Sequence, residues 1–177
     1  MISVRVAHTA QLDPGTLAEA RALLYAVFDD MTEADWDHSL GGVHALAYDG
    51  AELVGHAAVI QRRLLHGGRA LRTGYVEGVG VRADHQRRGH GGEMMDALER
   101  VIRDAYEVGA LGATDEGARF YAARGWRLWD GPLSALAPDG VVPTPDVQGA
   151  IYVLPVDGVP LDLAGSLVVD WRDGDVW

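Results

Sequence analysis

The 177-residue chain contains no cysteine, which excludes disulfide bonds and thiolate chemistry. It also has no apolar run near the roughly 18 residues of a membrane span, and residues 1–12 lack the charged-then-apolar pattern of a signal peptide. Basic residues are few: 15 Lys and Arg stand against 26 Asp and Glu, a net charge of −11. Because phosphate binding needs basic surface, this charge argues against a nucleic-acid partner. A cytoplasmic protein with neither membrane nor nucleic-acid partners is therefore expected.

The rest of the composition is typical of a globular protein, with 48% hydrophobic and 23% charged residues. A chain of this length supports one well-formed core, so we predict a single domain over residues 1–177. The acidic balance favours cationic ligands, although acidity also serves solubility alone. None of the seven histidines has a familiar metal-ligand spacing with carboxylates, so we expect surface or structural histidines and no metal site.

Hydrophobic periodicity predicts an alternation of strands and helices. In chain order the pattern gives strand 3–7, helices 17–28 and 33–39, strands 44–48, 53–65 and 69–81, helix 89–105, strand 108–113, helix 116–123, and strands 151–154 and 165–170. Asp49-Gly50 and Gly67-Gly68 are hairpin turn signals, so the three central strands are expected to pair in antiparallel succession. The order predicts an α+β fold, with a mixed, mainly antiparallel central sheet flanked by helices.

The strongest chemical signal is a glycine- and arginine-rich turn between a predicted strand and a predicted helix. Its residues are Gln86, Arg87, Arg88, Gly89, His90 and Gly91. A helix N-terminus leaves its first N–H groups unpaired and favours negative charge. Glycines let the backbone approach a pyrophosphate, and the two arginines add positive charge beside it. The alternative is a polar strand-to-helix turn that happens to contain arginines.

The pattern Gln/Arg-x-x-Gly-x-Gly/Ala at this place resembles the acetyl-CoA signature of the GNAT acetyltransferase superfamily. Residues 119–126 resemble the closing helix–strand motif of the same superfamily. The resemblance implies a GNAT fold in which backbone amides from about Arg87 to Gly91 hold the pyrophosphate of acetyl-CoA. It also implies that Val79 and Val81 pair with the pantetheine arm as an added strand would.

A closer resemblance, to the actinobacterial aminoglycoside 2'-N-acetyltransferases, covers nearly the whole chain. The stretches that carry it are residues 32–36, 40–46, 56–64, 74–79 and 170–177. It implies acetyl transfer from acetyl-CoA to the 2'-amine of an aminoglycoside, and a homodimer. Two alternatives stay open: a GNAT enzyme for another amine, such as a polyamine, a cell-wall amino sugar or a protein N-terminus, and a non-catalytic module that binds acyl-CoA or sequesters antibiotic.

The reaction requires a group that removes a proton from the substrate ammonium and an acid near the departing thiolate. Glu77 is the candidate base, acting directly or through water, and Tyr121 the candidate acid. The N–H of Val79 is a candidate to polarise the thioester carbonyl. Glu77 has the alternative of pairing with Arg72 or Arg82, and Tyr121 that of a core tyrosine with a surface hydroxyl.

The sequence pattern leaves the direction of the Glu77 side chain open. Strict alternation places it on one face of its strand with Tyr75 and Val79. Gly78 and Gly80, however, permit a bulge that would re-aim it.

A polycationic sugar calls for carboxylates near the acceptor site. The candidates for substrate binding are Glu77, Asp30, Asp35, Asp146, Asp175 and the terminal residue Trp177. Each aspartate has the alternative of a helix cap or a solvated surface group, and Asp35 follows Thr32 at capping-box spacing. Asp146 is followed by Val147 and Gln148 where the family commonly has further acidic residues. Burial of large aromatic rings is favourable, so the tail with Trp171 and Trp177 is expected to fold back into the acceptor site.

Overall fold

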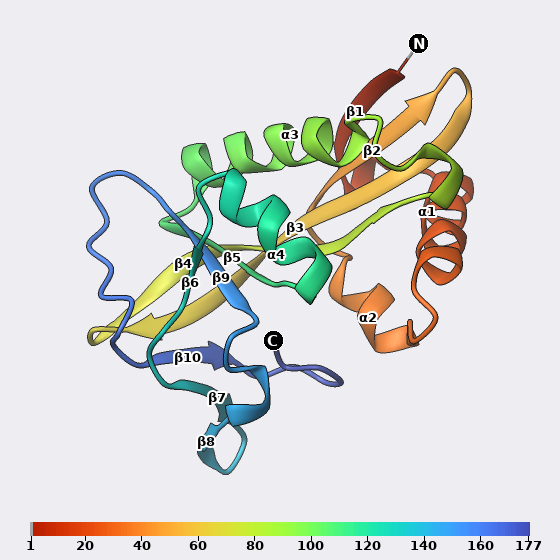
Figure 1. The fold of residues 1–177 in the computed structure, drawn as a ribbon. Helices are drawn as coiled ribbons and strands as arrows, with labels where there is room; N and C mark the ends of the chain where they lie inside the picture. The colour runs from red at the N-terminus through yellow and green to blue at the C-terminus, as the bar shows by residue number, and fades with distance from the viewer. Residues whose placement is uncertain (1) are drawn as a thin grey trace. The chain divides into compact units, whose positions relative to one another are not determined.

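The computed structural model describes residues 2–177, and its elements follow the predicted order with additions near the C-terminus (Figure 1). They are β1 (Ile2–His8), α1 (Pro14–Val27), α2 (Glu33–His38), β2 (Val43–Asp49), β3 (Glu52–His66), β4 (Arg69–Val81), α3 (His90–Ala105), β5 (Val108–Gly112), α4 (Asp115–Ala123), β6 (Arg127–Leu128), β7 (Leu133–Ala137), β8 (Gly140–Pro143), β9 (Ile151–Pro155) and β10 (Leu167–Asp170), with short 3-10 turns η1 (Thr9–Gln11), η2 (Ala83–His85) and η3 (Pro145–Val147).

The residues group into two compact units. Unit 1 holds the residues up to Ile60 together with Val76–Val101, and unit 2 holds Gln61–Tyr75 and Ile102–Trp177. Both β3 and β4 therefore contribute residues to each unit. The single domain expected from chain length stays a prediction.

The sheet of unit 1 begins with antiparallel pairing of β1 to β2 and of β2 to β3. One helical layer, α1 and α2, covers one face. Asp13 caps α1 by accepting from the Thr16 N–H at 2.9 Å, and Pro14 occupies its first turn. The helices bury Leu24 and Trp36 in a cluster with Leu46 of β2.

The opposite face of the unit 1 sheet is covered by α3. A Cβ at Gly55 of β3 would lie 3.0 Å from the Met94 methyl of α3, whereas a Cβ at Gly80 of β4 would lie 3.0 Å from the Leu24 side chain of α1. Both glycines allow a helix to approach the strand closely. Sequence neighbours in a strand point to opposite faces, so His56 lies on the α1 and α2 side, where its ring is 6.0 Å from that of Trp36.

In unit 2 the strand order is β6-β9-β5-β4-β3-β10-β7-β8. The β4–β5 and β7–β10 pairs are parallel, and the β5–β9, β6–β9, β3–β10 and β7–β8 pairs are antiparallel. The interior holds the fully buried rings of Trp129 and Tyr75. The predicted α+β fold, a mixed and mainly antiparallel sheet with flanking helices, is confirmed.

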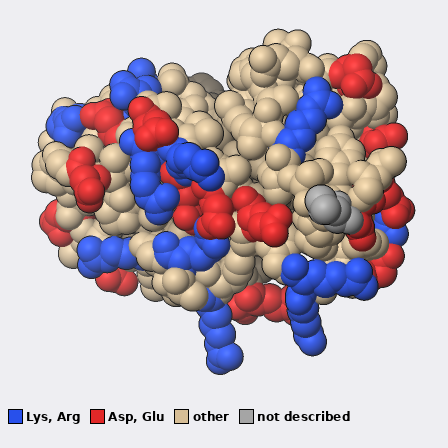
Figure 2. All heavy atoms as spheres, turned by 90° about the horizontal axis from the view of Figure 1, so that it is seen from above, with Lys and Arg blue, Asp and Glu red and all other residues tan. Residues whose placement is uncertain are grey.

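The sequence missed β6, β7 and β8, and it placed the last strand at 165–170 where β10 covers Leu167–Asp170. Within the described residues, no helix is both long and apolar enough to cross a bilayer. Figure 2 shows arginines and carboxylates interspersed over the face that it views.

Candidate active site

The predicted phosphate turn joins the end of β4 and η2 to the start of α3. Arg87 has a φ of 59° and Gly89 a φ of 91°, both in the left-handed region. Such a turn beside a helix start directs successive backbone N–H groups to one side and makes a concavity for anions. A Cβ on Gly89 would meet no atom within 4 Å, so the approach to this backbone is open. The turn therefore fits the pyrophosphate that the sequence pattern implies.

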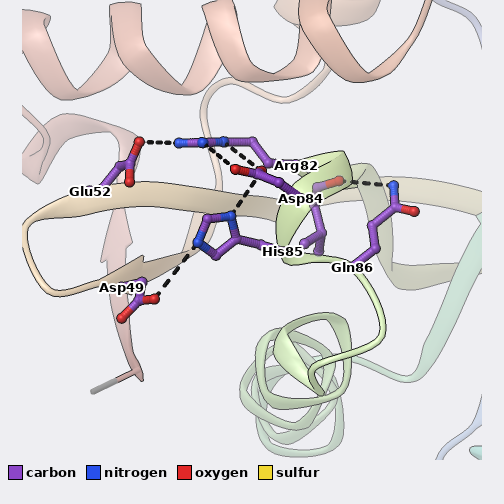
Figure 3. A network of polar contacts seen from close by, with 7 residues as sticks. Asp49, Glu52, Arg82, Asp84, His85 and Gln86 are labelled. Atoms are coloured by element: carbon purple, nitrogen blue, oxygen red, sulfur yellow. Dashed lines mark hydrogen bonds and ion pairs between the residues drawn. The ribbon is translucent and has the colours of Figure 1, made fainter.

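Polar contacts hold this turn in unit 1 against the strands beside it (Figure 3). The residues labelled there are Asp49, Glu52, Arg82, Asp84, His85 and Gln86. Arg82 bridges Glu52 and Asp84, and Asp84 also accepts from His85 Nδ1 at 2.9 Å. The His85 and Arg82 contacts lower the pKa of Asp84 to about 2. Gln86 Nε2 donates to the carbonyl of Val81 at 3.2 Å, so this predicted cofactor-binding side chain ties the turn to the end of β4.

His90 is the first residue of α3, and its side chain is buried. Neither ring nitrogen has a hydrogen-bond partner among the described residues. The exposed residues of the turn are Gln86, Arg87, Arg88 and Gly89. For His90 and the half-buried Gly91, the groups available to a ligand at this turn are therefore those of the backbone rather than of side chains.

Glu77 is half-buried on β4, next to a residue that interrupts the regular strand. Gly78 has a φ of 56°, and a Cβ there would lie 2.9 Å from Ser39 Oγ and 3.0 Å from Leu24. Conformation and space both require glycine at 78. Gly78 therefore departs from the extended backbone of the strand, and strict alternation does not fix the direction of its neighbour Glu77.

The two arginines considered as partners of Glu77 make other contacts. Arg72 Nε donates to the carbonyl of Ala105 at 2.8 Å, within unit 2. Arg82 binds Glu52 and Asp84, within unit 1. Both arginines thus have described contacts with groups other than the proposed base.

A series of hydrogen bonds through two buried histidines reaches the Gly78 carbonyl and was not recognised in the sequence. Thr9 Oγ1 lies 2.7 Å from His44 Nε2, His44 Nδ1 lies 2.9 Å from His56 Nε2, and His56 Nδ1 lies 2.8 Å from the carbonyl oxygen of Gly78. Both histidines are fully buried. Burial lowers the pKa of each to about 4, so both rings are neutral near pH 7.

Tyr121 lies on α4 in unit 2 and is buried against the rings of Phe120 and Trp126. Loss of hydration raises the pKa of its phenol to about 12, although nearby Arg124 acts in the opposite direction. The phenol therefore keeps its proton across the physiological range.

Of the two acidic candidates near the first helices, Asp30 is exposed and Asp35 is half-buried. The carboxylate of Asp35 accepts from the Thr32 N–H at 2.8 Å and from the Thr32 hydroxyl at 2.7 Å. Together with the Thr32 cap this completes the predicted capping box of α2. A substrate contact of Asp35 would use a carboxylate that already serves the helix.

The tail folds back within unit 2 at Trp177, which is 5% exposed, but not at Trp171, which is 48% exposed. Trp177 Nε1 donates to Thr144 Oγ1 at 2.8 Å, and its backbone N–H donates to Asp175 at 3.1 Å. Arg172 also donates to the Trp177 carbonyl at 3.0 Å. Burial of the ring is thus confirmed for Trp177 and was wrong for Trp171, while a place of the tail in the acceptor site stays a prediction.

The third acidic region is the loop at η3. Asp146 lies in η3 and is exposed. The nearby Gln148, which departs from the family pattern, directs its amide toward the backbone carbonyls of Asp130 and Gly131. At this position the amide therefore serves the loop itself.

The fold and the turn define an acetyltransferase, and the sequence comparison agrees. Residues 10–129 match the acetyltransferase (GNAT) domain, so the chain belongs to the GNAT acetyltransferase family and is an acyltransferase enzyme. It is 46% identical, over 99% of its length and 92% of the relative's, to "Aminoglycoside 2'-N-acetyltransferase" of Mycolicibacterium fortuitum.

Solved structures share the fold at low identity. The GNAT family N-acetyltransferase YhbS of Escherichia coli, crystallised with CoA, has a TM-score of 0.65 at 17% identity, covering 97% of this chain and 90% of that one. Eis1 of Mycobacterium abscessus has a TM-score of 0.63 at 19% identity over 76% of this chain, and the matched region is 33% of its own length.

Proposed function

We propose that this acetyltransferase transfers the acetyl group of acetyl-CoA to the 2'-amine of an aminoglycoside. One observation carries the proposal: the relative from Mycolicibacterium fortuitum that bears this activity in its name matches nearly end to end at 46% identity. The net charge of −11 supports a polycationic acceptor, because a negative surface attracts cations over long range.

Acetyl-CoA supplies the acetyl thioester, and the turn of unit 1 supplies its phosphate site. Backbone N–H groups from Arg87 to Gly91 bind the pyrophosphate, and the exposed Arg88 adds positive charge. Val79 and Val81 offer backbone groups to the pantetheine arm. The β4–β5 ladder, which ends at Tyr75, supports this role because both valines lie beyond it.

Three groups serve the chemistry, each in a separate role. Glu77 accepts the proton that the substrate ammonium loses, directly or through one water. The backbone N–H of Val79 donates to the thioester carbonyl, whose oxygen gains negative charge as the amine attacks. Tyr121 donates its phenolic hydrogen toward the departing sulfur.

Carboxylates bind the ammonium groups of the acceptor. The proposed set is Asp30, Asp35, Asp146 and Asp175, together with Trp177. The exposed Asp30, Asp146 and Asp175 can meet a cation without displacing the contacts of a helix cap. We also infer a homodimer that works in the cytoplasm, without a metal.

The test uses paired aminoglycosides that differ in a 2'-amine against a 2'-hydroxyl. The protein is mixed with acetyl-CoA and each antibiotic, and free thiol is measured with a disulfide reagent. Because the chain has no cysteine, every thiol detected comes from CoA. We expect thiol release and a mono-acetyl product only with the 2'-amine compound. Release with neither compound would refute the acceptor assignment, while antibiotic binding without turnover would favour sequestration.

The role of Glu77 is tested by Glu77→Gln, with Glu19→Gln on the exposed face of α1 as a matched control. A general base contributes about 10²- to 10⁴-fold, so we expect kcat to fall by roughly that range for Glu77→Gln while the Kd for CoA stays close to the original. The control variant should behave like the parent enzyme. A kcat unchanged by Glu77→Gln would remove Glu77 from the mechanism.

A further inference from the structure

Within unit 1, the hydrogen bonds that run from Thr9 through His44 and His56 end on a backbone carbonyl of the strand that carries Glu77. His44 and His56 belong to neighbouring strands, β2 and β3, where His44 is opposite Ala58 and His56 is opposite Leu46. This diagonal placement on one face brings the two rings to a centroid separation of 5.2 Å. The last bond, from His56 Nδ1 to the Gly78 oxygen, is 2.8 Å long.

The last acceptor in this series of hydrogen bonds, the carbonyl oxygen of Gly78, fixes where each proton lies. A carbonyl oxygen only accepts, so His56 Nδ1 carries hydrogen. A neutral His56 then has a lone pair on Nε2, which accepts from His44 Nδ1–H at 2.9 Å. His44 Nε2 in turn accepts from the hydroxyl of Thr9 at 2.7 Å. Burial holds both rings neutral by lowering the pKa of each to about 4, so one directional arrangement satisfies the three bonds of this series. The single hydroxyl hydrogen of Thr9 then goes to His44 at 2.7 Å rather than to the Gly42 carbonyl at 3.3 Å.

The hydrogen bond on the Gly78 carbonyl sets the direction of the backbone N–H of the next residue, Val79. Gly78 takes a φ of 56°, and its carbonyl meets His56 on the α1 and α2 side of the sheet. The Gly78–Val79 peptide is trans, because the described chain has no cis bond. In a trans peptide the C=O and N–H point in opposite directions. The Val79 N–H is therefore directed away from His56.

We propose that His56 is a positioning residue, supported by His44 and Thr9, that holds the Gly78–Val79 peptide so that the Val79 N–H is aimed at the thioester carbonyl. The proposal rests on the role given to Val79 under the proposed function. A hydrogen bond to the Gly78 oxygen also polarises the peptide and makes its N–H a stronger donor. The histidines thus act through the backbone without touching the reacting atoms.

Two substitutions at one position separate this role from simple packing. In His56→Asn the side-chain amide occupies the place of Nδ1–H and can still donate to Gly78, whereas His56→Leu fills similar volume without a donor. Loss of one oxyanion donor costs about 10²- to 10³-fold in kcat, and misalignment costs less, so we expect His56→Leu to lower kcat by about 10- to 100-fold. The KM for acetyl-CoA should change little, and His56→Asn should restore most of the lost turnover. Equal kcat in the two variants would overturn the proposal.

A second measurement needs neither activity nor a substituted protein. In ¹⁵N-histidine-labelled wild-type protein at pH 7, both His44 and His56 should give the neutral Nδ1–H tautomer. An Nε2–H tautomer at either position would break the directional chain and overturn the proposal, even if His56→Leu does not fold. Because this readout does not use antibiotic or acetyl-CoA, it also separates failure of this proposal from failure of the aminoglycoside assignment.

Discussion

Acidification from pH 7 to pH 5 should destabilise the protein through His44 and His56. The pKa of each is about 4 in the folded protein, chiefly because burial disfavours the cation. In the unfolded chain each returns to its ordinary value of about 6.5. The unfolded state therefore binds more protons than the native state between pH 6.5 and pH 4. Stability is fully present above pH 6.5 and is lost as the pH falls through this window.

The magnitude follows from proton uptake by the unfolded chain. At pH 5 an unfolded histidine is almost fully protonated while its native counterpart stays mostly neutral, which lowers the free energy of unfolding by about 2 kcal/mol relative to pH 7. The pair gives about 4 kcal/mol, a large part of the roughly 5–15 kcal/mol of a typical domain. The result depends little on the native pKa values as long as both lie well below 5. Carboxylates with lowered pKa, such as Asp84, contribute only below their ordinary value of about 4.

The assay is urea unfolding of the wild type and of the double variant His44→Asn/His56→Asn at pH 7 and pH 5, followed by tryptophan fluorescence. The wild type should lose about 4 kcal/mol more than the double variant between the two pH values, because asparagine takes up no proton. The comparison is a difference within each protein, so any loss of stability from the substitutions themselves cancels. The same pH dependence in both proteins would refute the buried neutral pair.

Three further outcomes follow from single contacts. Gly80→Ala places a Cβ 3.0 Å from Leu24, so thermal unfolding should show a loss of about 1–3 kcal/mol from overpacking. Arg87→Gly removes a non-glycine residue from the left-handed region and should stabilise the fold by about 1 kcal/mol. Calorimetry should show weaker CoA binding by the same variant, and tighter binding would exclude a role for the charge of Arg87. Trp177→Phe loses the bond from Nε1 to Thr144 and should cost about 1 kcal/mol in urea unfolding, and no further loss should appear when Thr144→Val is added.

Local patterns were sufficient for much of the fold and for the position of the turn that precedes α3. The turn at residues 86–91 could be predicted because its signal lies in one contiguous segment: glycines and arginines placed where a helix begins. The capping box of α2 depends on Thr32 and Asp35 alone, and it formed as expected. The strands β7 and β8 escaped prediction because the segment after Trp126 is rich in Pro and Gly, and its short strands gain their pairing from partners distant in sequence.

The histidine chain could not be predicted because it depends on register. His44 and His56 become neighbours only when β2 pairs with β3 in the observed alignment, and a shift of one residue would put one ring on the opposite face. The carbonyl of Gly78 meets His56 at a backbone position with a positive φ, which the residue types do not reveal. In the sequence, His44 and His56 are two separate histidines inside apolar strands. A useful signal would have been their place within long buried runs, where a histidine needs a hydrogen-bond partner.

The pKa of Tyr121 limits what that residue can do in the proposed reaction. A phenol whose pKa is about 12 would have to give its proton to a thiolate whose own pKa is about 8.5. Full transfer is then uphill by roughly 3.5 pKa units, or about 5 kcal/mol, which is too costly for the phenol to be the final source of the proton. A hydrogen bond from the neutral phenol to the sulfur carries no such cost and stabilises the charge as the bond breaks. The proton lost by the ammonium can instead reach the thiolate through solvent. We therefore propose Tyr121 as a fixed hydrogen-bond donor in this reaction rather than as the source of the proton. Its burial raises the cost of losing that proton beyond the cost for an ordinary phenol, which is itself protonated at physiological pH.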